Sequence, residues 1–174
     1  MRHIISVLVE NEFGVLARVA GLFSGRGFNI ESLCVAETLD PTVSAMTIAT
    51  RGSEAILEQI LKQLNKLINV IKVVDFRDLE HVSREMVLVK INATERNREE
   101  ILRMTEIFRG RVIDVSAKTY TVEITGTEDK IKAFLTLVKP LGVKELVRTG
   151  SIAMIRGEKM IQVSEKEPKG GTDG

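Results

Sequence analysis

The sequence predicts an α+β protein made of two units, each with the element order β-α-β-β-α-β. Residues 3–76 alternate in this order between the period of two that is typical of strands and the helical period of 3.6. Residues 86–147 repeat the same order with different residues. The chain has 174 residues, of which 44% are hydrophobic, so it can bury two small cores. Each unit therefore matches the ferredoxin-like plan, in which two helices cover one face of an antiparallel sheet.

The first unit is expected to open with a strand rich in β-branched residues and to continue with an amphipathic helix. This helix stops at Gly25 and Gly27, which we expect to be left-handed caps. Asp40 and Pro41 predict a turn, and Ser53 predicts the N-cap of the helix with the strongest apolar stripe. In chain order the expected elements are a strand at 3–10, a helix from Val15 to Phe23, strands at 30–38 and 43–50, a helix with apolar residues from Ile56 to Ile68, and a strand at 70–76.

The second unit repeats this order. Thr127, followed by two acidic residues, predicts the start of the last helix, which we expect to end near Pro140 and Gly142. The expected elements are a strand at 86–91, a helix from Ile101 to Phe108 that ends at Gly110, a hairpin with strands at 111–115 and 120–124, the last helix, and a strand at 143–147. The predicted domains are 1–78 and 84–156, joined by a linker at 79–83 and followed by a tail at 157–174 whose composition predicts disorder.

Composition and charge favour neither a membrane nor a nucleic-acid partner. The formal net charge is +1, with 8 Lys and Arg against 9 Asp and Glu up to Asp78, and 17 against 15 afterwards. No apolar run approaches the roughly 18 residues of a membrane span. The start of the chain lacks the apolar stretch of a secretion signal, so we expect a cytoplasmic protein. Cys34 is the only cysteine, which excludes an internal disulfide, and its apolar neighbours indicate a small buried side chain.

The sequence contains no recognisable motif for catalysis or metal binding. His3 and His81 are the only histidines, and neither has a second ligand at metal spacing. The pair of glycines at Gly25 and Gly27 ends a helix, whereas a dinucleotide-binding fingerprint opens one directly after a strand. An enzyme stays a possibility, because the absence of a motif does not exclude catalysis.

RNA binding is the next class to weigh, because the RNA-recognition module shares the β-α-β-β-α-β order. That module stacks bases on aromatic side chains of its first and third strands. Here the first strand, at 3–10, and the third strand, at 43–50, contain no aromatic residue. The sequence therefore argues against an RNA-binding sheet.

Two corners rich in Gly and Asn bracket the first helix, NEFG before it and GRGFN after it. Asn11 can accept hydrogen bonds from the free N–H groups of the helix start, and Gly14 leaves those groups open to a small carboxylate. A free amino acid needs donors for its carboxylate, acceptors for its ammonium group and an apolar slot. Together with Asn29 and Ile30, the first corner offers all three. The spacing alone equally allows that both asparagines only cap and turn the backbone.

Five blocks of the chain together resemble a known family: LVENEFGVLARVAGLFSGRGFNIESL, LEQILKQLNKLINVIKV, EMVLVKI, TEIFRGRVIDVS and YTVEITG. They resemble the regulatory (small) subunit of acetohydroxyacid synthase, also called acetolactate synthase, over about Arg2 to Gly157. The resemblance implies that the first unit is an ACT domain, an amino-acid-sensing form of the ferredoxin-like plan, followed by a second ferredoxin-like domain. Such subunits have no catalysis of their own. They bind and activate the catalytic large subunit and usually confer feedback inhibition by valine in branched-chain amino acid biosynthesis.

The resemblance also implies where the effector binds. In that family the effector lies between two ACT domains of a homodimer, held by the loop after the first strand of one subunit and by the start of the second strand of its partner. Carried over to this sequence, the loop residues are Asn11, Gly14, Val15 and Leu16, the residues from the partner are Asn29 and Ile30, and the residues that influence the site without being main contacts are Ala36 and Gln59.

No cofactor or metal is expected in this chain. The resemblance implies that thiamine diphosphate, Mg and FAD belong to the catalytic partner. The alternative function is another ACT-type amino-acid sensor, such as a transcription regulator. No helix-turn-helix unit accompanies the sensor in this sequence, which favours the enzyme subunit.

Overall fold

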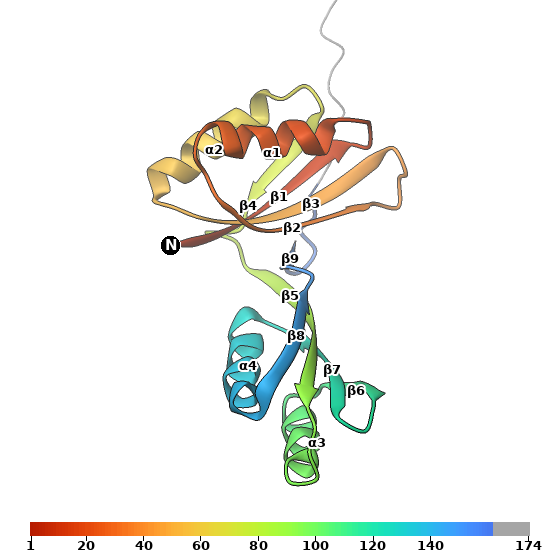
Figure 1. The fold of residues 1–174 in the computed structure, drawn as a ribbon. Helices are drawn as coiled ribbons and strands as arrows, with labels where there is room; N and C mark the ends of the chain where they lie inside the picture. The colour runs from red at the N-terminus through yellow and green to blue at the C-terminus, as the bar shows by residue number, and fades with distance from the viewer. Residues whose placement is uncertain (162–174) are drawn as a thin grey trace, which may run out of the picture.

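The computed structural model describes residues 1–161, which form two α+β units joined end to end in the chain (Figure 1). Residues 162–174, which hold most of the predicted tail, lie outside the described part. The first unit contains β1 (Arg2–Glu10), α1 (Val15–Gly25), β2 (Ile30–Glu37), β3 (Val43–Arg51), α2 (Glu54–Lys66) and β4 (Val70–Asp75). The second contains β5 (His81–Asn92), α3 (Arg98–Ile107), β6 (Arg111–Val115), β7 (Thr119–Gly126), α4 (Glu128–Gly142), β8 (Val143–Arg148) and β9 (Ile152–Ile155).

The sheets confirm the predicted fold class. The first is antiparallel with the order β2-β3-β1-β4, and the second repeats this arrangement as β6-β7-β5-β8. In both, the first and third strands of the unit lie in the centre. This is the strand order of a ferredoxin-like unit, so the α+β class with two such units in tandem is confirmed.

In the first unit, α1 and α2 cover one face of the sheet (Figure 1). Alternate residues of the central strands point to these helices because successive side chains of a strand face opposite sides. Ser53 is the N-cap of α2, as predicted, since its hydroxyl accepts from the Ile56 N–H over 3.4 Å. The fully buried side chains of this core include Ile5, Val7, Val19, Phe23, Met46, Ile48, Leu57, Ile60 and Leu64.

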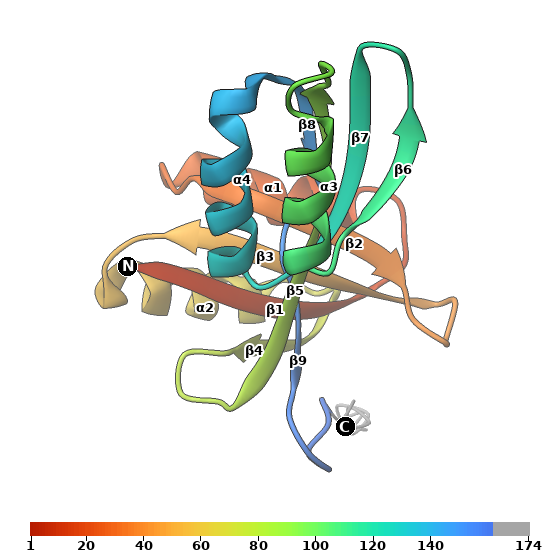
Figure 2. The same cartoon turned by 90° about the horizontal axis from the view of Figure 1, so that it is seen from below.

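In the second unit, α3 and α4 pack side by side against one face of the sheet (Figure 2). The rings of Phe108 and Phe134 meet edge to face with centroids 5.4 Å apart, which joins α4 to the end of α3. Thr127 caps α4 as predicted, with its hydroxyl accepting from the Lys130 N–H over 3.4 Å. The buried core includes Val87, Val89, Ile91, Ile101, Val122, Ile124, Ile131, Phe134 and Val138.

Three local features differ from the sequence analysis. Gly25 was expected to be a left-handed cap, and this is wrong, because Gly27 (φ 71°) takes up the left-handed conformation and Gly25 does not. Residues 81–84, which precede the expected strand, extend β5 because they pair with β9. β9 itself was missed, since its four residues are too few to show a clear period.

The second face of the first sheet lies toward the second unit, and Cys34 on this face donates to the Thr149 carbonyl. Ser6, Leu8 and Thr47 lie on this face and are less than a tenth exposed. The segment between β8 and β9 runs beneath it (Figure 1). Among residues 1–161, no helix is long and apolar enough to cross a bilayer.

Candidate functional site

The loop between β1 and α1 carries the first predicted corner. Gly14 is the N-cap of α1, with φ 81°, a conformation that favours glycine. A Cβ at Gly14 would have no heavy atom within 4 Å, so the position is open to its surroundings. The first turn of α1 has neither a side-chain cap nor an acidic residue. The N–H groups of Leu16 and Ala17 are therefore left to water or to an anionic ligand.

Asn11 acts differently from the prediction. It was expected to accept hydrogen bonds from the start of α1, and this is wrong, since no side chain caps that helix. Its amide instead donates to the Pro41 carbonyl over 2.9 Å and to the Glu37 carboxylate over 3.3 Å. Its backbone N–H also donates to the Thr42 carbonyl over 2.7 Å. Asn11 thus fixes the loop to the turn between β2 and β3.

A second anchor of this loop, Asn69, was not predicted from the sequence. Asn69 is 8% exposed, and its amide donates to the carboxylates of Glu10 (2.8 Å) and Glu12 (3.4 Å). Its side-chain oxygen accepts from Arg18 on α1. The loop between β1 and α1 is therefore held from both sides, while its tip, at Phe13, stands fully exposed. An asparagine that follows a helix gave no sign of this role in the sequence.

The two residues after Gly14 lie in different surroundings. Val15 is 3% exposed and belongs to the core of the first unit, whereas Leu16 is 45% exposed. Of the two side chains, Leu16 is the one that a ligand above the loop can contact. The buried side chain of Val15 is out of reach of such a ligand.

The second corner lies at the opposite end of α1. Asn29 is exposed, and its carbonyl accepts from the Thr50 hydroxyl over 2.7 Å, while Ile30 begins β2. The eleven residues of α1 separate the two corners by about 16 Å. One chain therefore does not bring Asn11 and Gly14 together with Asn29 and Ile30 around a single small ligand.

The two supporting positions are both exposed. Ala36 lies on β2, an edge strand of the sheet, opposite Ala45 of β3. Gln59 lies on α2, next to the buried Ile60. Ala36 directly precedes Glu37, whose carboxylate accepts from Asn11 of the first corner, whereas no hydrogen bond joins Gln59 to either corner within residues 1–161.

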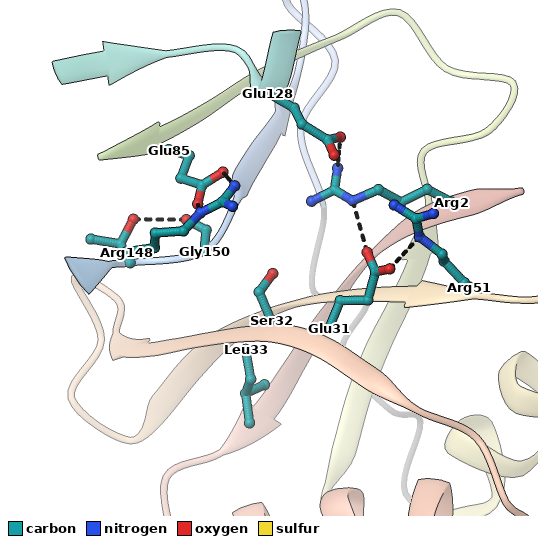
Figure 3. A pocket seen from close by; sticks show the side chains of 10 residues that line it. Arg2, Glu31, Ser32, Leu33, Arg51, Glu85, Glu128, Arg148 and Gly150 are labelled. Carbon is teal, nitrogen blue, oxygen red and sulfur yellow. Dashed lines mark hydrogen bonds and ion pairs between the residues drawn. The ribbon is translucent and has the colours of Figure 1, made fainter. Parts of the chain in front are cut away.

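A polar cleft lies elsewhere, between the two units, and no pattern in the sequence indicated it. It has a volume of about 560 Å³ and is lined by charged side chains of both units (Figure 3). Arg2, Glu31 and Arg51 enter it from the first unit, and their facing partners come from β5, α4 and β8. Residues that line the cleft include Arg2, Glu31, Ser32, Arg51, Glu85, Glu128, Arg148 and Gly150.

Ion pairs cross and line this cleft. Arg148 binds both oxygens of Glu85, which is 3% exposed, over 2.6 and 3.0 Å. This bond to Glu85 raises the pKa of the Arg148 guanidinium. Cys34 also faces the junction, since its thiol donates to the Thr149 carbonyl over 2.8 Å. Burial, followed by the charge of Glu85, raises the pKa of that thiol.

Both histidines have structural roles. The Nε2 atom of His3 lies 3.0 Å from the Gly52 carbonyl oxygen, and the side chain is 3% exposed. His81 lies against the ring of Phe76, with centroids 5.0 Å apart. In the part of the chain that the structure describes, no three His, Cys, Asp or Glu side chains are grouped to hold a metal ion.

Comparison with known proteins gives matches along most of the chain. The family model for the small subunit of acetolactate synthase matches residues 84–157, and the model for the AHAS small subunit-like ACT domain matches residues 5–72. The acetolactate synthase small subunit of Haemophilus influenzae is 53% identical over 162 residues, which are 92% of this chain and 99% of that protein. The isozyme 3 small subunit of Escherichia coli is 52% identical over 163 residues, covering 93% and 100%.

A solved structure extends this similarity to three dimensions. The crystal structure of the acetolactate synthase small subunit from Thermotoga maritima matches with a TM-score of 0.82 and 41% sequence identity, over 91% of this chain and 99% of that chain. The sequence and structural matches both span the ACT domain and the second unit. The chain therefore belongs to the family of acetolactate synthase small subunits.

Proposed function

We propose that this chain is the regulatory subunit of an acetolactate synthase, in which it activates the catalytic large subunit and confers feedback inhibition by valine. The reaction, together with thiamine diphosphate, Mg and FAD, belongs to the catalytic partner in this proposal, and the assembly is cytoplasmic. The observation that carries the proposal is the uncapped start of α1 at Gly14, in a loop anchored by Asn11 and Asn69.

The start of α1 suits the carboxylate of an amino acid. Its N–H groups and helix dipole favour a negative charge by up to about 2 kcal/mol in a partly buried geometry. No acidic side chain in the first turn competes for this place. The exposed Leu16 offers apolar contact to a branched side chain such as that of valine.

The separation of the two corners supports a site shared by two chains. A single valine cannot span the length of α1, so contact with both corners needs Asn29 and Ile30 from a second copy. The strand that begins at Ile30, β2, forms an edge of its sheet and has no neighbouring strand on its outer side in the described chain. An unpaired strand edge is a natural place for two ACT domains to meet.

The expected affinity suits the sensing of a metabolite. Valine has about eight non-hydrogen atoms, and half of the ceiling of about 1.5 kcal/mol per atom corresponds to a dissociation constant in the micromolar range. A ligand held between two chains binds only the assembled state and stabilises it by mass action. If the catalytic subunit prefers one arrangement of the dimer, valine and the catalytic subunit are coupled reciprocally.

Reconstitution with the catalytic subunit tests this function. We expect the chain to raise the activity of the catalytic subunit and valine to lower it again. Gly14→Asp should keep the activation and lose the response to valine, because it places a negative charge beside the carboxylate of the ligand. Gly14→Asn is the matched control, since it has nearly the same shape and the same positive φ without the charge. Full valine inhibition with Gly14→Asp would contradict the proposed site.

A further inference from the structure

β2 connects the second corner to the second unit. Glu31 directly follows Ile30, and its carboxylate pairs with Arg2 of β1 over 3.2 Å and with Arg51 of β3. The side chain of Glu31 is 25% exposed. The position of the start of β2 is thus tied by charge to β3, which lies beside it, and to β1, the next strand of the sheet.

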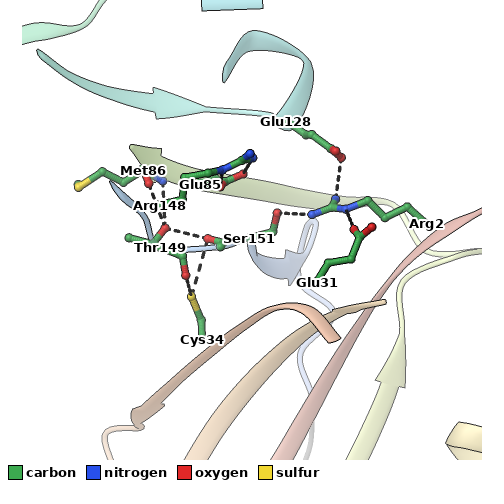
Figure 4. A network of polar contacts seen from close by, with 10 residues as sticks. Arg2, Glu31, Cys34, Glu85, Met86, Glu128, Arg148, Thr149 and Ser151 are labelled. Carbon is green, nitrogen blue, oxygen red and sulfur yellow. Dashed lines mark hydrogen bonds and ion pairs between the residues drawn. The ribbon is translucent and has the colours of Figure 1, made fainter. Parts of the chain in front are cut away.

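Arg2 carries this connection across the cleft. Its guanidinium pairs with Glu128, the first residue of α4, over 2.8 Å and donates to the Ser151 hydroxyl over 3.0 Å (Figure 4). Ser151 is 3% exposed, and the side chain of Arg2 is 20% exposed. A single guanidinium therefore holds Glu31 in one unit and Glu128 and Ser151 in the other. Partly buried, charge-assisted bonds of this kind are stronger than pairs in open water.

A second contact joins β2 to the same segment of the second unit. Gly150, with φ 82°, lies so close to β2 that an added Cβ would be 2.6 Å from the Cβ of Ser32. Beside it, the thiol of Cys34 donates to the Thr149 carbonyl. β2 therefore packs tightly against Thr149 and Gly150 on one face, while its first residue belongs to the second corner.

We propose that Arg2 is a positioning residue that couples the second corner to the second unit, so that a ligand at Asn29 and Ile30 changes how the second unit sits against β2. The proposal deepens the proposed function and rests on it for the identity of the ligand. Gly150 makes the coupling possible, because only glycine allows the segment to approach Ser32. We name the set of Arg2, Glu31, Glu128, Gly150 and Ser151 the joint.

The coupling is expected because the residues of the joint can respond to a displacement of β2 in only a few ways. Glu31 is one residue from Ile30 in an extended strand, so a displacement at the corner moves its carboxylate by a similar amount. Arg2 must then either follow Glu31 or keep its bonds to Glu128 and Ser151. An element with two such alternatives can bias two distant sites, which is what coupling between them requires.

Arg2→Gln tests the coupling. In the reconstituted enzyme we expect the valine concentration for half inhibition to rise by about tenfold, a normal size for an allosteric coupling. Direct binding of valine to the isolated full chain should change by less than about threefold, because Arg2 does not touch the ligand. If Arg2 only stabilised the fold, Arg2→Gln would change the valine concentration for half inhibition and the direct affinity for valine by similar factors. Loss of valine binding and inhibition to the same extent would overturn the proposal.

Arg77→Gln is the matched control. Arg77 also pairs with two carboxylates of its own unit, Asp75 at 2.9 Å and Glu54 at 3.8 Å, and its side chain is 25% exposed. Within residues 1–161, Arg77 has no ion pair or side-chain hydrogen bond with the second unit. Inhibition by valine should therefore be unchanged, and a shift as large as that of Arg2→Gln would overturn the proposal.

Gly150→Ala tests the close approach. Gly157→Ala is its control, since Gly157 has φ 75° and no heavy atom within 4 Å of an added Cβ, so both variants carry a similar backbone strain. Only Gly150→Ala should weaken inhibition by valine. If both variants weakened inhibition by valine equally, backbone strain alone would explain the loss. That result would contradict the proposed role of the joint.

Hydrogen exchange separates a failure of the joint from a failure of the proposed function. Without any ligand, Arg2→Gln should speed amide exchange in residues 148–152, and Arg77→Gln should not. A wild-type chain that binds no valine would overturn the proposed effector, and with it the coupling. The exchange result would still decide whether Arg2 holds the second unit on β2, and unchanged exchange in Arg2→Gln would overturn that role.

Discussion

The side-chain amide of Asn11 donates to the carbonyl oxygen of Pro41 over 2.9 Å. This bond joins the loop between β1 and α1 to the turn between β2 and β3, and a second bond, from the Asn11 N–H to the Thr42 carbonyl, runs beside it. The role of Asn11 is therefore to fix the loop that presents Gly14. Its side-chain amide is already engaged before any ligand arrives.

Asn11→Ala should weaken valine binding by about fivefold, which corresponds to the roughly 1 kcal/mol of one net hydrogen bond. Asn65→Ala is the matched control, because Asn65 donates the same kind of amide bond, to the Leu61 carbonyl over 2.9 Å, on α2. Calorimetric titration of both variants checks the prediction. Equal affinities in Asn11→Ala and wild type would show that the loop does not need this anchor.

Arg148→Gln should lower the free energy of unfolding by about 3 kcal/mol, since it leaves the buried carboxylate of Glu85 without its cation. The value lies at the low end for such pairs because the side chain of Arg148 is 45% exposed and partly screened. Arg111→Gln is the control. Its pair with Glu123 spans 3.5 Å on an arginine that is 80% exposed, and its loss should cost less than about 1 kcal/mol.

Denaturant unfolding of the two arginine variants measures these losses. Adding Glu85→Gln to Arg148→Gln should restore part of the stability, because it removes the unpaired charge. Similar losses for Arg148→Gln and Arg111→Gln would contradict the importance of the buried pair.

Cys34 should react slowly with alkylating agents at pH 8. Its pKa is raised by burial and by the charge of Glu85, so the reactive thiolate is scarcer than for a free thiol, and the rate should keep rising with pH beyond the ordinary titration range. Mass spectrometry of the chain treated with iodoacetamide follows the reaction. The chain unfolded in urea serves as the reference, and equal rates in the folded and unfolded chains would refute the prediction.

The order of the elements could be predicted because it depends on local patterns. Hydrophobic period and capping residues act over a few positions, and the caps at Ser53 and Thr127 were found in this way. β9 escaped because its partner, the start of β5, lies about seventy residues earlier in the chain and four residues carry little pattern of their own.

The two corners were visible in the sequence, but their hydrogen bonds were not. Asn11 beside a helix start suggests a cap, and its partner Pro41 is brought to it only by the pairing of β1 with β3. The bond between Arg2 and Ser151 joins residues at opposite ends of the described chain. In the sequence, Arg2, Glu31 and Glu128 look like ordinary surface residues. The joint could therefore be recognised only from the structure.

Calorimetric titration of the full chain with valine tests the central claim most directly. Leucine, isoleucine and serine at the same concentrations provide the comparison, and serine should bind least because it lacks a branched apolar side chain. We predict saturable binding of valine with a dissociation constant of about 10 µM to 1 mM, at one site per chain or one per two chains. No saturable heat from valine in the millimolar range would contradict the claim that this chain senses valine.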